Sequence, residues 1–168
     1  MPTTGLLDMR KKEVTAVFFS DGVRRLLVPR RALDRLCAYE RQSGRVEQGG
    51  ILLGKVFCDH DEVVRVCAPS RDDVPEFFSF LRRKRPAQRK INRAWNASGG
   101  YLIYLGEWHT HPGGEALPSG VDRRMIKHAL RRTRMEIEYL YLIIAGKDGS
   151  CWGGRQDREG LNPLQAEE

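Results

Sequence analysis

The stretch that decides the fold is Glu107-Trp108-His109-Thr110-His111-Pro112, together with Ser119-Gly120-Val121-Asp122. Residues 101–110 alternate and contain aromatic side chains, which predicts a strand that Pro112 ends by removing a ladder donor. Residues two apart on a strand point to the same face, so the rings of His109 and His111 can meet one ion. A helix is expected to begin near Gly120, which places Asp122 at its mouth as a third ligand.

This ligand pattern is typical of a catalytic metal. Three protein ligands with an open position characterise catalytic zinc, whereas structural zinc is closed by four side chains, mostly Cys and His. No cysteine lies near these ligands in the sequence. Zinc lowers the pKa of bound water to about 7, so a hydrolytic site needs only a base, usually a carboxylate. We therefore expect one catalytic Zn²⁺ ion.

Several residues admit a structural interpretation instead. Ser119-x-x-Asp122 also fits a capping box that satisfies the first amides of a helix, and that alternative stays open here. Glu47 taken singly is a surface glutamate before a buried strand. Trp108 alternates to the face opposite His109 and is expected in the core. Further interpretations of the same kind cover the remaining motif residues: close strand packing for Gly49, Gly50 and Gly54, no metal for Cys58-x-His60, and solvent exposure for His128.

The combined motif resembles that of a known family. His109-x-His111-Pro112, six intervening residues and Ser119-x-x-Asp122 resemble the signature of the JAMM (JAB/MPN) zinc metalloproteases, and residues 47–54, Glu-Gln-Gly-Gly-Ile-Leu-Leu-Gly, are similar to their upstream glutamate block. The resemblance implies zinc on His109, His111 and Asp122. It also implies Glu47 as general acid/base and Ser119 as a hydrogen-bond donor to the oxyanion.

The resemblance also implies a fold and a substrate class. The fold is an α+β, single MPN/JAB-like domain with a mixed β-sheet flanked by helices, a cytidine-deaminase-like architecture. The block Gly-Glu-Trp-His-Thr-His-Pro resembles bacterial JAB deconjugating proteases encoded beside ubiquitin-transfer-like enzymes in CBASS or Bil anti-phage operons. Such relatives cut after the C-terminus of a ubiquitin-like protein or a similarly conjugated nucleotidyltransferase. The implied partners are that C-terminal tail and the operon-encoded transfer enzymes.

Other classes of protein remain as rivals. A non-catalytic MPN scaffold would assemble with partners, but such scaffolds typically lack the ligands. A RadC-like domain would use basic residues to bind nucleic acid. A zinc nucleoside deaminase requires H-x-E with a later P-C-x-x-C, and neither occurs in this sequence.

Composition favours one folded domain. The 168 residues are 40% hydrophobic and 30% charged, which suits a single globular core. No apolar run approaches the roughly 20 residues that cross a bilayer, and residues 1–12 lack the apolar core of a signal peptide. We therefore expect a cytoplasmic protein without a membrane partner, whose four cysteines stay as thiols and act as small hydrophobes.

The formal net charge of +7 is concentrated in two basic runs, residues 82–93 and 123–134. Such runs attract nucleic acid, anionic lipid or an acidic protein surface. A solvated helix face is the alternative, and nucleic acid is the less favoured partner.

The order of elements follows from periodicity and turn residues. We expect a hairpin from residues 14–19 and 23–28, a helix over 29–44 and strands at 50–57 and 63–68. Within the polar segment 82–97 we expect a helix that starts at Pro86 rather than at Arg82. The strand 101–110, a helix from near 120, and strands at 139–145 and 150–152 follow. Residues 1–153 are then the JAB/MPN domain. Residues 154–168 break both helix and strand patterns and are expected to be a flexible tail.

Overall fold

The computed structural model describes residues 15–70, 74–75, 80–81, 84–134 and 136–167. Its helices are α1 (Arg30–Gln42), α2 (Lys84–Ala97), α3 (Gly120–Arg132) and a short 3₁₀ turn η1 (Lys147–Gly149). The main-sheet strands of these described residues are β1 (Ala16–Ser20), β2 (Arg25–Pro29), β3 (Gly49–Val56), β4 (Asp61–Val66), β7 (Ile103–Thr110), β8 (Leu140–Ala145), β9 (Cys151–Gln156), β10 (Leu161–Pro163) and β11 (Gln165–Ala166), and β5 (Val74–Pro75) pairs with β6 (Phe80–Leu81).

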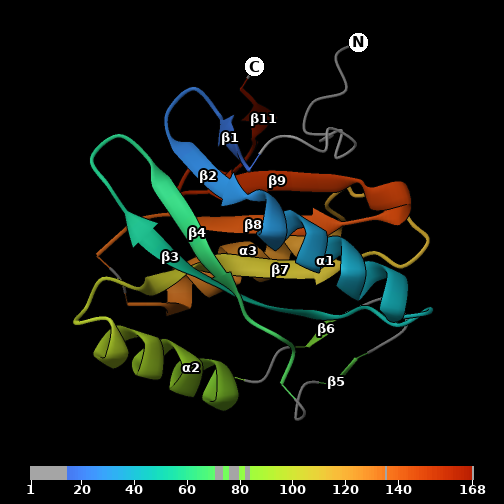
Figure 1. The fold of residues 1–168 in the computed structure, drawn as a ribbon, viewed down its shortest axis with the longest axis horizontal. Helices are drawn as coiled ribbons and strands as arrows, with labels where there is room; N and C mark the ends of the chain where they lie inside the picture. Colours follow the sequence, from blue (N-terminus) through green and yellow to red (C-terminus); the bar gives the residue numbers. More distant parts are fainter. Residues whose placement is uncertain (1–14, 71–73, 76–79, 82–83, 135, 168) are drawn as a thin grey trace.

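The main sheet is mixed and has helices on both faces. Its strand order is β10-β9-β8-β7-β3-β4-β2-β1-β11, with β2–β4 and β7–β8 parallel and the other pairs antiparallel. In Figure 1, α1 crosses the front of the sheet and α3 lies behind it. One apolar core lies between α1 and the sheet, and a second is formed by α2 and α3 on the other face. The α+β fold with a mixed sheet flanked by helices is confirmed.

Most of the elements lie close to their predicted ranges. The first hairpin turns at Asp21, whose Oδ1 accepts hydrogen bonds from the backbone N–H groups of Val23 and Arg24 at 3.0 and 2.9 Å. The prediction for the start of α2 was wrong, because the helix begins at Lys84 rather than at Pro86. Proline is tolerated there since the N–H groups of a first helical turn have no intrahelical partner.

The end of the chain forms strands where the sequence indicated none. β9 crosses the predicted boundary at residue 153, β10 pairs with β9, and β11 pairs with β1 at the opposite edge of the sheet. Leu164 lies between them, and its N–H donates to the Gly153 carbonyl at 2.9 Å. The last strands therefore join both edges of the sheet.

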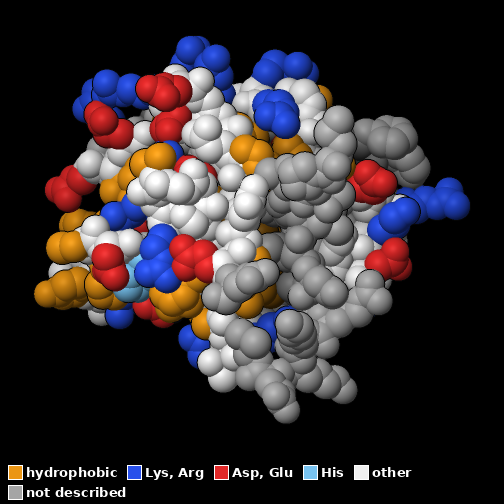
Figure 2. Space-filling view, turned by 90° about the horizontal axis from the view of Figure 1, so that it is seen from above, with side chains coloured by type: hydrophobic (Ala, Val, Ile, Leu, Met, Phe, Trp, Pro, Cys, Tyr) orange, Lys and Arg blue, Asp and Glu red, His pale blue; other side chains and the backbone are white. Residues whose placement is uncertain are grey.

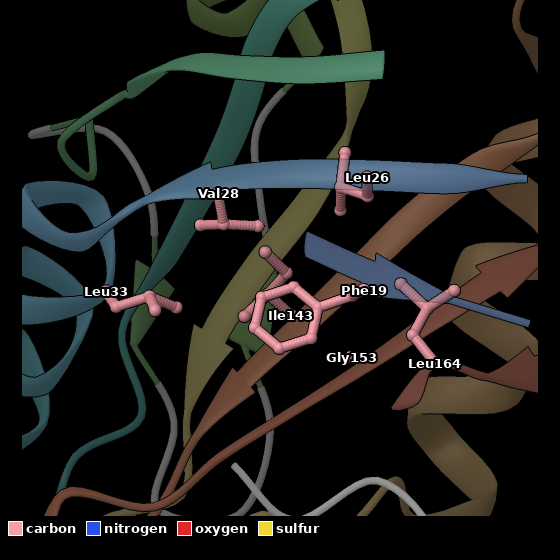
Figure 3. Close-up of a pocket in the computed structure, with 7 residues that line it drawn as sticks. All are labelled: Phe19, Leu26, Val28, Leu33, Ile143, Gly153 and Leu164. Carbon is pink, nitrogen blue, oxygen red and sulfur yellow. The ribbon is translucent and has the colours of Figure 1, made fainter. Parts of the chain in front are cut away.

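The side chain of Leu164 enters an apolar pocket at this junction (Figure 3). The pocket has no polar side chain in its lining, so we interpret it as part of the apolar core and not as a ligand site. Its residues come from β1, β2, α1, β8, β9 and the C-terminal segment: Phe19, Leu26, Val28, Leu33, Ile143, Gly153 and Leu164.

The surface bears on three further predictions. All four cysteines are free thiols; Cys37, Cys67 and Cys151 are buried as small hydrophobes are, whereas Cys58 is exposed. No described helix is both long and apolar enough to span a membrane.

Figure 2 shows Lys and Arg side chains interspersed with Asp and Glu over the described part of one face. The excess positive charge is therefore not gathered on that face.

Candidate metal centre

Two elements bring the three predicted ligands together. His109 lies near the end of β7, His111 follows that strand, and Asp122 is the third residue of α3. The two Nε2 atoms are 3.2 Å apart. Asp122 Oδ1 lies 3.1 Å from Nε2 of His109, and its Oδ2 lies 3.3 Å from Nε2 of His111. Among the described residues, this is the one group of three or more such side chains whose ligand atoms converge.

These separations fit a metal ion. A tetrahedral zinc site with bonds of about 2.1 Å has ligand atoms about 3.4 Å apart, close to the 3.1–3.3 Å separations between the two imidazole nitrogens and between each nitrogen and one oxygen of Asp122. Two imidazole nitrogens and a carboxylate oxygen that face one point concentrate electron pairs, and a shared cation relieves that repulsion. His109 and Asp122 are 2% and 6% exposed, so little water reaches them. The residues present therefore fit zinc.

Backbone contacts fix the orientation of His111. Its Nδ1 lies 3.0 Å from the Glu115 carbonyl oxygen, to which an Nδ1–H group can donate. That tautomer leaves the lone pair of Nε2 directed into the site, which is the usual arrangement for a metal-binding histidine.

Asp122 both caps α3 and faces the two histidines, the two roles that the sequence left open. The Ser119 N–H donates to Asp122 Oδ2 at 2.6 Å, and the Asp122 N–H donates to Ser119 Oγ at 3.2 Å. This is a capping box, and the same carboxylate also faces both histidines. The cap holds the carboxylate in place, so the two interpretations of Asp122 do not exclude each other.

The electrostatics of the cluster favour an ionised carboxylate. Burial alone would raise the pKa of Asp122, but hydrogen bonds from the two histidines and from the Ser119 N–H hold that pKa well below its ordinary value. Burial lowers the pKa of His111, yet its contacts with Asp122 and Glu115 outweigh burial and raise that pKa. The centre is thus suited to holding a positive charge.

The strand register places Glu47 beside these ligands. Gly49 pairs with His109, and the Thr110 N–H donates to the Gln48 carbonyl at 2.8 Å. Continuing that register puts Glu47 opposite His111, and opposed residues of an antiparallel pair share a face. Burial raises the pKa of Glu47, while the histidines act in the opposite direction. A carboxylate with a raised pKa is suited to accepting a proton.

Ser119 lies exposed at the mouth of the site. Its hydroxyl oxygen accepts the capping hydrogen bond from Asp122, so the O–H group can still donate to another acceptor. The catalytic role of Ser119, like those of Glu47 and the ligands, stays a prediction.

The sequence did not single out Glu40, the residue that supports the ligand loop. Glu40 lies on α1, is 9% exposed, and its Oε1 accepts a hydrogen bond from the Gly113 N–H at 3.1 Å. A signal was present, because Glu40 continues the apolar stripe of Leu33, Leu36 and Cys37. A charged residue on such a stripe is rarely buried without a partner.

The other residues of the motif have structural roles. Trp108 is confirmed in the core, where its Nε1–H donates to the Cys67 carbonyl at 2.9 Å. Gly50 and Gly54 are confirmed as close-packing positions, because a Cβ atom at either would lie within 2.5 Å of a backbone oxygen. His128 is exposed as expected. Cys58 and His60 join no group of metal ligands among the described residues.

Comparison with known proteins shows the family of the chain. Residues 29–154 match the family model described as prokaryotic homologs of the JAB domain. A relative from Vibrio cholerae named "CD-NTase/cGAS isopeptidase" is 30% identical over 88% of this chain and 92% of its own length. A relative of the same name from Escherichia coli is 29% identical over 89% and 93%. A "Probable metalloprotease y4qB" from Sinorhizobium fredii is 30% identical over 49% of this chain and 54% of its own length.

A solved structure supports the fold alone. The solution structure of a Desulfitobacterium hafniense protein superposes with a TM-score of 0.59 at 23% identity, covering 84% of this chain and 88% of that one. The names of the sequence relatives support a peptidase-type enzyme. The match to the family model spans most of the sequence and includes the site, so the chain belongs to the family of prokaryotic homologs of the JAB domain.

Proposed function

We propose that the chain is a zinc-dependent isopeptidase of anti-phage defence that acts in the cytoplasm. It cleaves after the C-terminal residue of a conjugated CD-NTase-type nucleotidyltransferase or of a ubiquitin-like protein. The observation that carries the proposal is the convergence of His109, His111 and Asp122 at tetrahedral spacing. The names of the relatives support the substrate class.

Each residue has a role that its position allows. His109, His111 and Asp122 would hold zinc, which supplies Lewis acidity that activates water and polarises a carbonyl. Glu47 takes a proton from the attacking water and returns it to the departing lysine amine. The Ser119 O–H donates to the carbonyl oxygen as negative charge develops on it.

The test uses zinc-loaded protein and a CD-NTase whose C-terminal carboxyl group is joined to the lysine ε-amine of a fluorescent peptide. Wild type should release the peptide. Glu47→Gln should lower kcat by about 10²-fold or more, as expected when a general base is lost, while its zinc content stays stoichiometric. Glu62→Gln on β4 is the matched control and should keep full activity. Equal rates for Glu47→Gln and wild type would exclude this mechanism.

A non-catalytic scaffold predicts a different result in the same experiment. Such a protein would bind the conjugate without releasing the peptide, whatever its zinc content. Absence of cleavage with both the CD-NTase conjugate and a ubiquitin-like conjugate would favour that rival.

A further inference from the structure

The helix that supplies Asp122 presents a basic surface to solvent. Arg124, Lys127, His128 and Arg131 recur at spacings of three and four residues, so they form one stripe along α3. All four are exposed. Asp122 and Ile126 are buried on the opposite side of the helix. We name these four residues the α3 stripe.

The stripe begins at the end of α3 that carries Asp122, on the other side of the helix. A Cβ atom placed on Gly120 would lie 3.5 Å from Nη1 of Arg124, so this guanidinium group lies over the first turn of α3, next to Gly120. Helix geometry puts Arg131 about 10 Å further along the axis than Arg124. The stripe therefore leads away from the mouth of the site across the outer surface of the protein.

Helix stability does not account for this arrangement. Positive side chains at spacings of three and four residues repel one another. The helix dipole disfavours Arg124 near the N-terminus and favours Arg131 in the last turn, so the dipole does not explain the stripe as a whole. Among the described residues, no ion pair neutralises a member of the α3 stripe. The only acidic residue of α3 is Asp122, which faces the histidines. A negatively charged partner would relieve the repulsion.

The surroundings of the stripe favour a protein partner. Leu117 and Val121 flank Ser119 in the sequence and are 42% and 48% exposed. Apolar side chains at the mouth of the site suit contact with a peptide, whereas phosphates would gain nothing from them. An apolar contact next to a basic stripe matches a protein with an apolar C-terminal tail and an acidic folded body.

We propose that the α3 stripe binds an acidic surface on the folded body of the protein whose C-terminal tail enters the metal centre. This inference rests on the proposed function and adds a second contact beyond the tail. Surface charges of this kind speed association and set its salt dependence. The α3 stripe would then select conjugates by their folded body, while Leu117 and Val121 contact the tail.

The experiment compares two probes that share one cleavage point. The first is the CD-NTase conjugate described above, and the second is its isolated C-terminal tail peptide joined to the same fluorescent lysine. The test variant replaces Arg124, Lys127 and Arg131 with Glu. The matched control replaces Arg31, Arg89 and Arg93 with Glu, because these exposed cations of α1 and α2 lie outside the stripe and make the same change in charge.

The test variant should lower kcat/KM for the whole conjugate by about tenfold, the effect of losing several surface ion pairs. The tail peptide should be cleaved at the wild-type rate, and the control variant should match wild type with both probes. Binding of the conjugate to Glu47→Gln protein, which keeps the α3 stripe but does not cleave, is measured by calorimetry and should weaken as salt rises. Equal losses with both probes, or none with either, would overturn the inference.

Two further outcomes separate the possible failures. If wild type binds the conjugate through the stripe but cleaves neither probe, the proposed function fails and the docking surface stands. Gel shifts with single- and double-stranded DNA test the other class of partner. DNA binding that is lost in the test variant, with conjugate cleavage unchanged, would assign the stripe to nucleic acid and overturn the inference.

Discussion

The carboxylate of Glu40 accepts a hydrogen bond from the backbone N–H of Gly113, with 3.1 Å between Oε1 and nitrogen. Gly113 has a φ of +67°, which places it in the left-handed region two residues after His111. α1 is thereby tied to the loop that continues to Glu115, whose carbonyl oxygen orients His111. We therefore expect Glu40 to be a positioning residue, which acts on His111 through this loop.

Replacing Glu40 should therefore affect zinc affinity. Glu40→Met keeps the volume of the side chain but removes the acceptor, and zinc should bind about tenfold more weakly, as when an outer partner of a ligand is lost. Glu40→Gln keeps an amide oxygen at that position and should bind zinc as wild type does. Chelator competition measures the affinity, and urea unfolding of the metal-free proteins checks that both variants fold. Wild-type affinity in Glu40→Met would contradict the positioning role.

Some residues of the candidate site could be predicted from local sequence and others could not, because they depend on how distant segments pack. The spacing of His109 and His111 on a strand is local, so it could be interpreted without the fold. The placement of Glu47 depends on the pairing of β3 with β7, about 60 residues apart in the sequence, and only the family resemblance indicated it. The apolar stripe of α1 indicates that Glu40 is buried, but its contact with Gly113 depends on where α1 packs, which no local pattern fixes.

The same distinction explains the error at the end of the chain. β10 and β11 have three and two residues, too few for a period to be detected. These two strands are held in place because β10 pairs with β9, β11 pairs with β1, and Leu164 between them is buried. Long elements with a periodicity of their own were predicted from the sequence. Short strands that form only because they pair with strands distant in the sequence were not.

Asp122→Asn should separate the two roles of Asp122. An asparagine oxygen can still accept from the Ser119 N–H, so the cap should largely survive. The neutral amide is a poor zinc ligand, and the two remaining histidines should hold the ion weakly. We expect loss of stoichiometric zinc by mass spectrometry, with a change in metal-free unfolding free energy below about 1 kcal/mol. Retained zinc would show that Asp122 is only a helix cap.

Leu164→Ala should destabilise the fold. Leu164 is 2% exposed, and truncation of such a leucine costs about 2–5 kcal/mol through lost burial and the cavity that remains. Gln165→Ala is the matched control, because the exposed Gln165 pairs through its backbone and should change stability by less than about 0.5 kcal/mol. Urea unfolding measures both. Equal stability of the two variants would mean that residues after 153 are not part of the core.

The ion pair between Asp21 and Arg155 should make the unfolding free energy depend on pH in the acid range. Arg155 Nε donates to Asp21 Oδ2 at 2.7 Å, which links the β1–β2 turn to β9. Burial would raise the pKa of Asp21, but the N–H groups of Arg24 and Val23 and the guanidinium of Arg155 lower it below the ordinary 3.8.

A carboxyl group with a lowered folded-state pKa stabilises the protein above its unfolded-state pKa, and that stabilisation is lost as the pH falls through the folded-state pKa. The difference in unfolding free energy between wild type and Asp21→Asn should be largest near neutral pH. It should begin to shrink below about pH 3.8, where Asp21 of the unfolded wild type is protonated, and should vanish only once the pH falls below the lower folded-state pKa, where residue 21 is neutral in both proteins. Urea titrations at a series of pH values measure this difference. Asp34→Asn, which loses an exposed pair with Arg30, should change stability by less than about 1 kcal/mol throughout. A difference for Asp21→Asn that stays constant down to strongly acidic pH would mean that hydrogen-bond geometry, and not the charge of Asp21, stabilises this junction.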